Sequence, residues 1–384
     1  MSVSGTNTYI ATIEAVDPSG QIARQRVQVE VSDVVVPFLA TSTSTLGPST
    51  HFLEVGDIDG DGHLDAVELT ATSLRLHVGG GDGTFTWTSS TSITPAEPGY
   101  GAALAVGDFD GVGGDDVARS SSGMEVETWL SMGRSGFRRS GVSSSRGPTL
   151  LKAGHYDGDS YLDLLGFSWF DWEVTLLTGD GLGSFNQTWT GFISPFVSND
   201  FGAGDVSGDG LVDFAVAGSS LLRVMGEWDY FGAVTVWITS STDRPQIVTL
   251  LDDWPRFASA MVLGDFNEDG RDDIVATGVD LVYLESLGGG NFAAPALLTP
   301  SSTGALLSAD VNADGHLDLI EYSGTPSIVR VYHGGGDGTF GPARTSTISI
   351  QAFGVRLGDA DEDGLLDLIL LREGGVEFAR GTGE

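Results

Sequence analysis

The stretch Asp57-Ile-Asp-Gly-Asp-Gly-His-Leu-Asp65 decides the fold, because related stretches recur along the chain. Carboxylates stand at its positions 1, 3, 5 and 9, and glycine stands at position 6. Seven copies, Asp loops 1 to 7, cover residues 57–65, 108–116, 155–163, 205–213, 265–273, 310–318 and 359–367. Their starts are 51, 47, 50, 60, 45 and 49 residues apart. A period near 50 residues is typical of four-stranded β-propeller blades.

Short apolar runs flank each Asp loop and predict buried strands. Residues 52–56 (Phe-Leu-Glu-Val-Gly) precede Asp loop 1, and residues 66–69 (Ala-Val-Glu-Leu) follow it. A glycine-rich turn such as Gly79–Phe85 then leads into a further strand. One such sheet cannot cover both of its faces, whereas seven sheets arranged radially can. We therefore predict an all-β fold, a seven-bladed β-propeller of four-stranded blades.

The predicted propeller occupies residues 37–384. Its last repeat ends at residues 380–384 (Arg-Gly-Thr-Gly-Glu), where a fourth strand should begin. Residues 38–46 resemble an unpaired fourth strand. We expect the strand at 37–46 to close the ring by pairing with the last blade.

Residues 1–36 differ from the repeats and predict a β-hairpin. Tyr9, Ala11 and Ile13 alternate with polar residues, and residues 17–20 (Asp-Pro-Ser-Gly) form a turn before a second alternating run. The hairpin resembles the last two strands of a bacterial immunoglobulin-like domain. That resemblance implies a remnant of such a domain in a longer multidomain chain. The alternative is a hairpin that decorates the propeller.

Composition excludes several partners. The chain has 53 acidic and 18 basic residues and a net charge of −35, which disfavours nucleic acid and anionic membranes. It has no cysteine, so disulfides, thiolate metal sites and cysteine nucleophiles are excluded. There is no apolar run long enough to insert into a membrane, and no signal peptide at residues 1–20.

The spacing of oxygen donors in the Asp loops predicts calcium. Calcium takes six to eight hard oxygen ligands. Carboxylates at positions 1, 3, 5 and 9 and the carbonyl at position 7 can wrap one ion, and glycine at position 6 permits the positive φ of the turn. Magnesium needs a tighter octahedron, and zinc needs clusters of His or Cys. The predicted ligands of the five complete loops are Asp57, Asp59, Asp61, Asp65, Asp205, Ser207, Asp209, Asp213, Asp265, Asn267, Asp269, Asp273, Asp310, Asn312, Asp314, Asp318, Asp359, Asp361, Asp363 and Asp367.

Two Asp loops are incomplete. Loop 2 has Val112 at position 5, and loop 3 has His155 at position 1 and Ser160 at position 6. We expect these loops to be empty or weak, so that the chain holds about five calcium ions and up to seven. Turn chemistry alone could explain a single Asp-Gly pair, but not five copies in register. The candidate ligands of the incomplete loops are Asp108, Asp110, Asp116, Asp157, Asp159 and Asp163.

The repeated loop resembles the FG-GAP or VCBS-type repeat over residues 37–384. The same repeats form the head propellers of integrin α-subunits and occur in many bacterial surface and secreted proteins. The resemblance implies calcium between the first and second strands of a blade. It also implies an extracellular, secreted or cell-surface location, with adhesion or ligand binding as the usual role.

Aromatic residues predict a binding surface on the face opposite the Asp loops. In a meander, the links between blades and the turns between second and third strands share that face. Exposed aromatic rings stack on sugars or fill protein pockets, although they can also cover the interfaces between blades. The candidate ligand-binding residues are Tyr100, Trp169, Phe170, Trp172, Phe196, Trp254 and Phe257.

The expected function is a calcium-binding extracellular interaction or adhesion module without catalysis, with a protein or glycan ligand. One alternative is the propeller domain of a secreted polysaccharide-active enzyme, a lyase or a hydrolase. Another is a structural spacer in a surface stalk. The clustered acids are committed to metal loops, the six histidines are scattered, and no nucleophile elbow or phosphate loop occurs. These features disfavour the enzyme.

Overall fold

A computed structural model shows the fold of the chain as two compact units, Met1–Val36 and Pro37–Glu384. Its described residues contain strands and turns and no helix. None of the described segments therefore forms a helix of the length and apolarity needed to cross a membrane. The structure describes residues 7–16, 22–31, 38–45, 50–94, 103–121, 125–144, 148–168, 173–192, 196–224, 227–239, 246–250, 259–278, 280–300, 304–324, 327–348, 352, 354–372 and 375–383.

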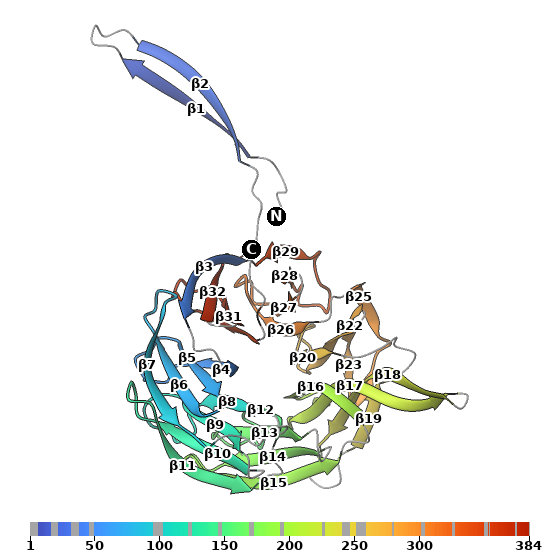
Figure 1. The fold of residues 1–384 in the computed structure, drawn as a ribbon. Coiled ribbons are helices and arrows are strands. Elements are labelled where there is room, and N and C mark those ends of the chain that lie inside the picture. The colour runs from blue at the N-terminus through green and yellow to red at the C-terminus, as the bar shows by residue number, and fades with distance from the viewer. Residues whose placement is uncertain are drawn as a thin grey trace. The chain divides into compact units, whose positions relative to one another are not determined.

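The second unit consists of seven four-stranded antiparallel sheets, blades 1 to 7 (Figure 1). Blades 1 to 3 contain β4 (Thr50–Gly56), β5 (Asp65–Thr70), β6 (Ser73–Gly79), β7 (Phe85–Ser92); β8 (Leu104–Gly107), β9 (Asp116–Ser121), β10 (Glu125–Ser131), β11 (Phe137–Ser144); and β12 (Leu150–Gly154), β13 (Asp163–Ser168), β14 (Glu173–Gly179), β15 (Phe185–Phe192). Blades 4 and 5 contain β16 (Phe196–Gly204), β17 (Asp213–Val224), β18 (Glu227–Ile238), β19 (Gln246–Leu250); and β20 (Ala260–Gly264), β21 (Asp273–Thr277), β22 (Asp280–Leu284), β25 (Ala296–Pro300). Blades 6 and 7 contain β26 (Ala305–Ala309), β27 (Asp318–Gly324), β28 (Ser327–Tyr332), β29 (Arg344–Thr347); and β30 (Gly354–Gly358), β31 (Asp367–Arg372), β32 (Gly375–Gly381), β3 (Phe38–Thr45).

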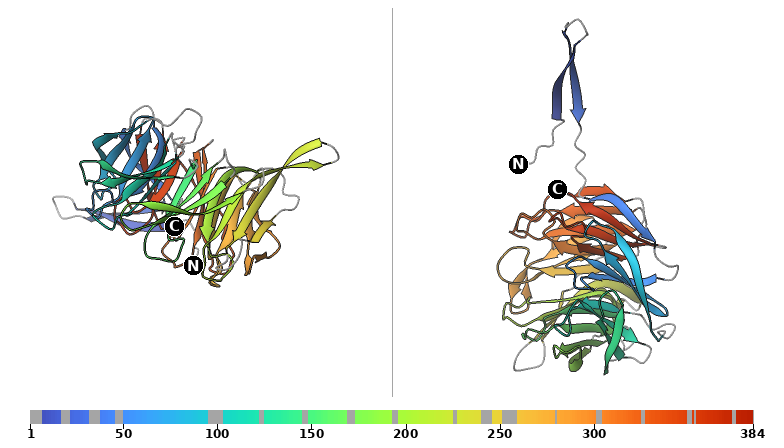
Figure 2. Two further views of the ribbon diagram at one scale, coloured as in Figure 1. Left: turned by 90° about the horizontal axis from the view of Figure 1, so that it is seen from below. Right: turned by 90° about the vertical axis from the view of Figure 1, so that its left-hand side faces the viewer.

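The sheets stand around one axis with their first strands innermost, as Figures 1 and 2 show. The prediction of a seven-bladed, four-stranded propeller is thus confirmed. Blade 5 carries an additional two-stranded sheet formed by β23 (Ser286–Gly288) and β24 (Asn291–Phe292).

The two ends of the propeller unit meet in blade 7. Strand β3 pairs antiparallel with β32, from Phe38 opposite Gly381 to Thr45 opposite Gly375. The outermost strand of the last blade therefore comes from the start of the unit, and the ring is closed by backbone hydrogen bonds. The pairing joins the start of the unit to its last blade, and each blade keeps only the short edge strands that are usual in a propeller.

The hydrophobic core is divided among the blade interfaces. Seven clusters of buried residues occur, and each joins one pair of neighbouring blades, including blade 7 with blade 1. In the last case Leu53 and Phe85 of blade 1 pack with Ile369 and Phe378 of blade 7. Each fully buried aliphatic or Phe side chain contributes about 1.5–3 kcal/mol. Every blade is thus stabilised by both of its neighbours.

Blade 4 explains the long spacing of 60 residues between Asp loops 4 and 5. Strands β17 and β18 are 12 residues each, and they pair from Phe214 opposite Trp237 to Val224 opposite Glu227. This long hairpin extends beyond the neighbouring blades in Figure 1. The extra sequence therefore lies in one hairpin and leaves the strand order of the ring unchanged.

The first unit is an antiparallel hairpin of β1 (Asn7–Val16) and β2 (Ile22–Val31). Its ten residue pairs run from Asn7 opposite Val31 to Val16 opposite Ile22. The hairpin itself agrees with the alternation in the sequence. Its relation to an immunoglobulin-like domain stays a prediction.

Candidate metal centres

Each Asp loop joins the first strand of a blade to its second. Strand β4 ends at Gly56, for example, and β5 begins at Asp65, so Asp loop 1 fills the gap between them. The other six loops hold the same place in their blades. Since all blades share one strand order, the seven loops lie on one face of the ring, which we call the Asp-loop face.

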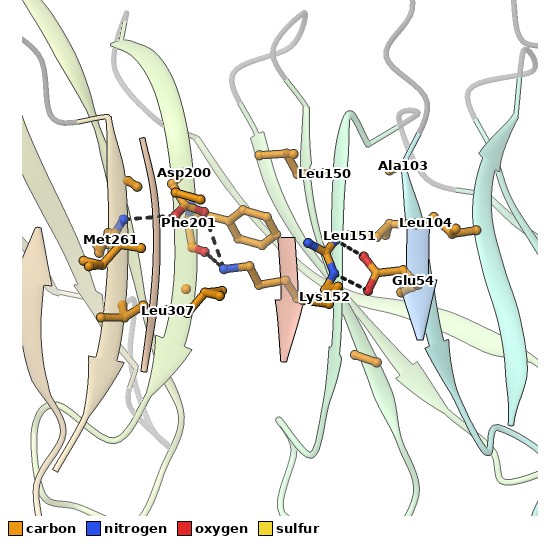
Figure 3. Close-up of a pocket in the computed structure, with 18 of the residues that line it drawn as sticks. Glu54, Ala103, Leu104, Leu150, Leu151, Lys152, Asp200, Phe201, Met261 and Leu307 are labelled. Atoms are coloured by element: carbon orange, nitrogen blue, oxygen red, sulfur yellow. Dashed lines mark hydrogen bonds and ion pairs between the residues drawn. The ribbon is translucent and has the colours of Figure 1, made fainter. Parts of the chain in front are cut away.

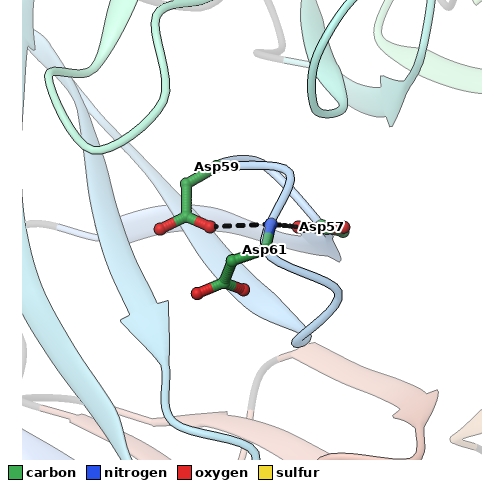
Figure 4. Close-up of side chains that lie close together, drawn as sticks. All are labelled: Asp57, Asp59 and Asp61. Carbon is green, nitrogen blue, oxygen red and sulfur yellow. Dashed lines mark hydrogen bonds between the residues drawn. The ribbon is translucent and has the colours of Figure 1, made fainter.

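The carboxylate at position 1 accepts two backbone hydrogen bonds from later residues of each complete loop. Asp57 Oδ1 accepts a hydrogen bond from the Asp61 N–H at 3.0 Å (Figure 4). Asp57 Oδ2 accepts one from the Gly62 N–H, also at 3.0 Å. The corresponding two bonds occur in Asp loops 4 to 7. The five loops that are complete in sequence are therefore also alike in backbone geometry.

Left-handed backbone at positions 4 and 6 brings the later ligands round. Gly62 at position 6 has φ +90°, in agreement with the role predicted for that glycine. At position 4, Glu268, Ala313 and Glu362 have φ +57°, and they are the non-glycine residues with positive φ among those described. Such a conformation costs about 1–2 kcal/mol for an L-residue. The loop architecture therefore overrides local preference at these positions.

The aspartate at position 9 anchors the loop to the blade. Asp65 is fully buried, and its Oδ2 accepts the Ile58 and Asp59 N–H groups, both at 3.0 Å. Its Oδ1 accepts the Gly79 N–H at 2.8 Å. Burial raises the pKa of Asp65 to about 6, and burial raises that of Asp116 to about 7. A buried carboxylate of this kind is best compensated by a nearby cation.

Carboxylates gather tightly enough in four loops to hold a metal ion. In each, one oxygen from each of three aspartates lies within 4.8 Å of the others. Asp361 Oδ1 is in addition a buried atom without a hydrogen-bond partner. An all-oxygen donor set with an unsatisfied carboxylate oxygen fits a hard cation such as calcium. The four clusters are Asp57, Asp59, Asp61; Asp108, Asp110, Asp116; Asp157, Asp159, Asp163; and Asp359, Asp361, Asp367.

Loops 4 to 6 carry a neutral oxygen donor at position 3. Asn312 Oδ1 accepts the Asp314 N–H at 2.9 Å, while its amide nitrogen donates to Asp314 Oδ2 at 2.9 Å. Asn267 makes the same two contacts with Asp269. Ser207 Oγ lies 3.4 Å from Asp205 Oδ1. Each of these side chains thus keeps an oxygen inside its loop.

The incomplete loops differ in backbone contacts but keep three clustered acids. In loop 2 Asp108 Oδ1 accepts the Gly111 N–H at 2.8 Å, and Val112 is 70 % exposed. In loop 3 the His155 ring contacts the Tyr161 carbonyl at 2.9 Å, the oxygen that a metal would use at position 7. That these two loops bind metal weakly or not at all stays a prediction.

Two arginines that the sequence did not single out lie across loop carboxylates. Arg134, in the turn between β10 and β11, places Nε 2.6 Å from Asp59 Oδ2 and Nη2 2.7 Å from Asp61 Oδ2. Arg380 of β32 places Nε 3.0 Å from Asp361 Oδ2 and Nη2 2.6 Å from the position-5 carboxylate of the same loop. Both guanidinium groups bridge positions 3 and 5. Among the described residues, no Lys or Arg pairs with the ligand positions of loops 2, 3 and 4.

Neighbouring loops are also joined to one another. Asp115, at position 8 of loop 2, accepts the Asp57 N–H at 3.0 Å through its side chain and donates its own N–H to the Asp57 carbonyl at 2.7 Å. Asp272 of loop 5 makes the same pair of contacts with Asp205 of loop 4. The consecutive aspartates at positions 8 and 9 of these two loops are the sequence signal for this contact, which the spacing of the ligands alone did not predict.

The glycine turn of a blade rests on the Asp loop of the preceding blade. The Gly83 N–H of blade 1 donates to the Ala360 carbonyl of loop 7 at 2.9 Å, and the Gly183 N–H of blade 3 donates to the Phe109 carbonyl of loop 2 at 2.9 Å. Blades 5 and 6 make similar contacts to loops 4 and 5. The geometry of a loop is therefore set partly by the next blade.

The aromatic face predicted from the sequence cannot be assembled. Phe196 belongs to β16, and its side chain is not described. The other six candidates lie outside the described residues, namely Tyr100, Trp169, Phe170, Trp172, Trp254 and Phe257.

Comparison with solved structures shows the fold alone. A lectin of Agrocybe aegerita that recognises non-reducing terminal N-acetylglucosamine is 16 % identical, with a TM-score of 0.55, covering 85 % of this chain and 86 % of the lectin. BBS1N, solved in complex with ARL6DN, is 12 % identical, with a TM-score of 0.61, covering 90 % of this chain and 98 % of that one.

Comparison of sequences adds the family. No curated protein matches the chain. The family model for the FG-GAP-like repeat matches residues 57–118, 265–321 and 310–370, and each match begins at the first residue of an Asp loop. These three matches and the seven blades confirm the predicted resemblance to FG-GAP-repeat β-propellers.

Proposed function

We propose that the chain is a calcium-loaded extracellular interaction module that binds a protein or glycan without catalysing a reaction. The observation that carries the proposal is the gathering of three carboxylates in each of Asp loops 1 and 7, with the orphaned Asp361 Oδ1 in loop 7. Calcium is the hard cation whose ligand number and flexible geometry suit such loops. When bound, it would neutralise the carboxylates and cross-link the positions of each loop.

The ring supports a role in binding. Each of its seven interfaces contains a cluster of buried hydrophobic residues, and several of its loops are hydrogen-bonded to the next blade. A closed ring of this kind holds its surfaces in fixed geometry, which lowers the entropy cost of binding a partner. Two proteins of similar fold bind quite different partners, a terminal sugar and another protein, so the fold is compatible with either class.

The extracellular location is part of the same proposal, and the family resemblance supports it. Extracellular calcium modules bind with dissociation constants of about 10⁻⁴–10⁻³ M, a range that exposed loops of three or four acids can reach. The absence of cysteine leaves no disulfide to stabilise the fold, so bound ions are the available cross-links.

Calorimetric titration with calcium, together with melting curves in calcium and in EDTA, tests the proposal. We expect several ions per chain and a lower melting temperature in EDTA, because an ion that binds only the folded state stabilises it. Asp359→Asn should reduce the number of bound ions by one. Asp82→Asn, in an exposed glycine turn, is the matched control and should leave that number unchanged.

A chain that takes up no calcium, and melts at the same temperature with and without EDTA, would overturn the metal role. The non-catalytic role is tested separately, by incubating the calcium-loaded chain with acidic polysaccharides and measuring new reducing ends and unsaturated products. Either product would favour the polysaccharide-active enzyme.

A further inference from the structure

The innermost strands of the seven blades enclose a central channel with a cavity of about 690 Å³ (Figure 3). This volume falls in the range of about 300–1,000 Å³ that is usual for small-molecule sites. All seven blades contribute to its lining. The channel is therefore a cavity of the ring as a whole, and Tyr156 of Asp loop 3 is among its lining residues.

One layer of the channel has a charged side and an apolar side. Glu54, Lys152 and Arg356 each stand two residues before the end of their innermost strand, in blades 1, 3 and 7. The equivalent residues of the other four blades also line the cavity and carry small or apolar side chains, namely Ala105, Gly202, Val262 and Leu307.

The charged side balances two cations against two carboxylates. Arg356 Nε donates to Glu54 Oε2 at 2.7 Å. Lys152 Nζ lies 3.5 Å from Asp200 Oδ1 and also donates to the Phe201 carbonyl, while Asp200 Oδ2 accepts the Met261 N–H at 3.0 Å (Figure 3). The channel is thus neutral within a chain of net charge −35.

Lys152 is the only lysine in the sequence, and the other seventeen basic residues are arginines. Its side chain is 43 % exposed although it lies inside the ring, so the side chain is accessible from the channel. The Arg356 side chain is 36 % exposed. Both cations can therefore reach a ligand while they remain near their carboxylates.

We propose that the central channel binds a neutral, hydroxyl-rich ligand, the end of a glycan chain. A hydroxyl group both donates and accepts, so neighbouring hydroxyls can bridge a carboxylate and a cation without separating them. Hydrogen bonds to charged groups are also the stronger ones. The C–H face of a sugar would lie on the apolar side, against Val262 and Leu307.

Charged ligands fit this channel less well. An anion is repelled by the net negative charge of the chain, and either kind of ion would have to break an existing pair. The inference rests on the proposed role of the ring as an interaction module and is independent of calcium. A purely structural role is the competing explanation, since the Glu54–Arg356 pair joins blade 1 to blade 7.

The single lysine provides a direct probe. Reductive methylation with ¹³C-formaldehyde labels the Lys152 amine and the chain terminus, and the two signals are told apart by their titration with pH. Methyl glycosides of glucose, galactose, mannose and N-acetylglucosamine are then titrated in calcium and in EDTA, with glycerol and methyl glucuronide as controls. We expect at least one neutral glycoside to shift the Lys152 signal saturably under both conditions.

Arg356→Met should weaken that binding about tenfold or more, the effect of losing a hydrogen bond from a charged group. Arg138→Met is the matched control, because Arg138 is exposed on the outermost strand of blade 2. Asp200→Asn is a second test if the first variant does not fold. Three results would overturn the proposal: no saturable shift with any neutral glycoside, an equal shift with glycerol, or a shift with the glucuronide alone. Failure of calcium uptake leaves this readout intact, so the two proposals fail separately.

Discussion

Asp loops 1 and 3 share the buried aspartate at position 9 but differ at position 1 and in their contact with an arginine. In both, the position-9 aspartate is fully buried and accepts three backbone N–H groups, Asp65 in loop 1 and Asp163 in loop 3. Loop 1 then has four acids and an arginine across two of them, whereas loop 3 has His155 at position 1 and no basic partner among the described residues. The comparison separates the aspartate at position 9, which the fold needs, from the remaining acids, which a metal would need.

Replacement of the shared aspartate at position 9 should have the largest effect on stability. Asp65→Ala and Asp163→Ala each leave three backbone donors without an acceptor, at a cost of about 1–3 kcal/mol per buried donor. We expect both variants to lose about 3 kcal/mol or more of stability in EDTA, measured by urea unfolding. Asp82→Ala, in an exposed turn, should leave the unfolding midpoint unchanged. A large loss in loop 1 alone would mean that the aspartate at position 9 stabilises the fold only in a complete loop.

Repair of loop 3 should give the next largest effect. His155→Asp combined with Ser160→Gly restores the position-1 carboxylate and the residue that tolerates positive φ. We expect one additional calcium ion by calorimetry and up to about 2.7 kcal/mol of added stability at a hundredfold excess over the dissociation constant. Asn186→Asp adds a carboxylate on β15 of the same blade, outside the loop, and should add no ion. An unchanged ion count in the repaired loop would show that spacing alone does not make the site.

The pattern of repeats and blades could be predicted because it is local. The apolar runs beside each Asp loop predict the strands that flank it, and the period of about 50 residues predicts a four-stranded blade. The arginines could not be found this way. Arg134 reaches Asp59 across 75 residues of sequence, because the glycine turn of blade 2 rests on Asp loop 1. The signal was a substitution within that turn, where Arg134 stands in the place of Asp82 of blade 1.

The charged layer of the channel could not be predicted from the sequence either, for a different reason. Glu54, Lys152 and Arg356 each stand alone within an apolar strand, and only the closed ring brings them to one layer. The role of the aspartate at position 9 was predicted in part. The sequence indicated a metal ligand there but not the three backbone N–H groups that its carboxylate accepts. The prediction of an aromatic face stays a prediction, because six of its seven residues lie outside the described part of the chain.

The next largest effect should be a pH dependence of stability, and its sign depends on whether calcium is bound. Burial raises the pKa of Asp65 and Asp367 to about 6 and that of Asp116 to about 7, whereas unfolded aspartate titrates near 3.9. Between these values the folded state binds more protons than the unfolded state, so stability in EDTA should fall as pH rises from about 4 to about 7. Saturating calcium should remove or reverse the trend, because the ion favours the ionised carboxylates.

Melting curves at pH 5 and pH 7.5, in EDTA and in calcium, measure this. Asp116→Asn should flatten the dependence in EDTA by removing one of the groups concerned, while Asp82→Asn, with a fully exposed carboxylate, should not. A melting temperature that rises between pH 5 and pH 7.5 in EDTA would show that the buried aspartates do not control stability there.

The smallest effect should come from the arginine across loop 1. Its guanidinium occupies oxygens of Asp59 and Asp61, both proposed ligands, so it competes with an incoming cation both for these atoms and by charge. Arg134→Met should therefore raise the calcium affinity of loop 1, by a factor of about five or less because Arg134 is 65 % exposed and exposed ion pairs are weak. Competition with a chromophoric chelator measures the change, and Arg138→Met on the adjoining β11 is the matched control. If the affinity fell, the arginine would instead be holding the two carboxylates in place for the ion, and the most acidic loops would owe their binding strength to a residue from the next blade.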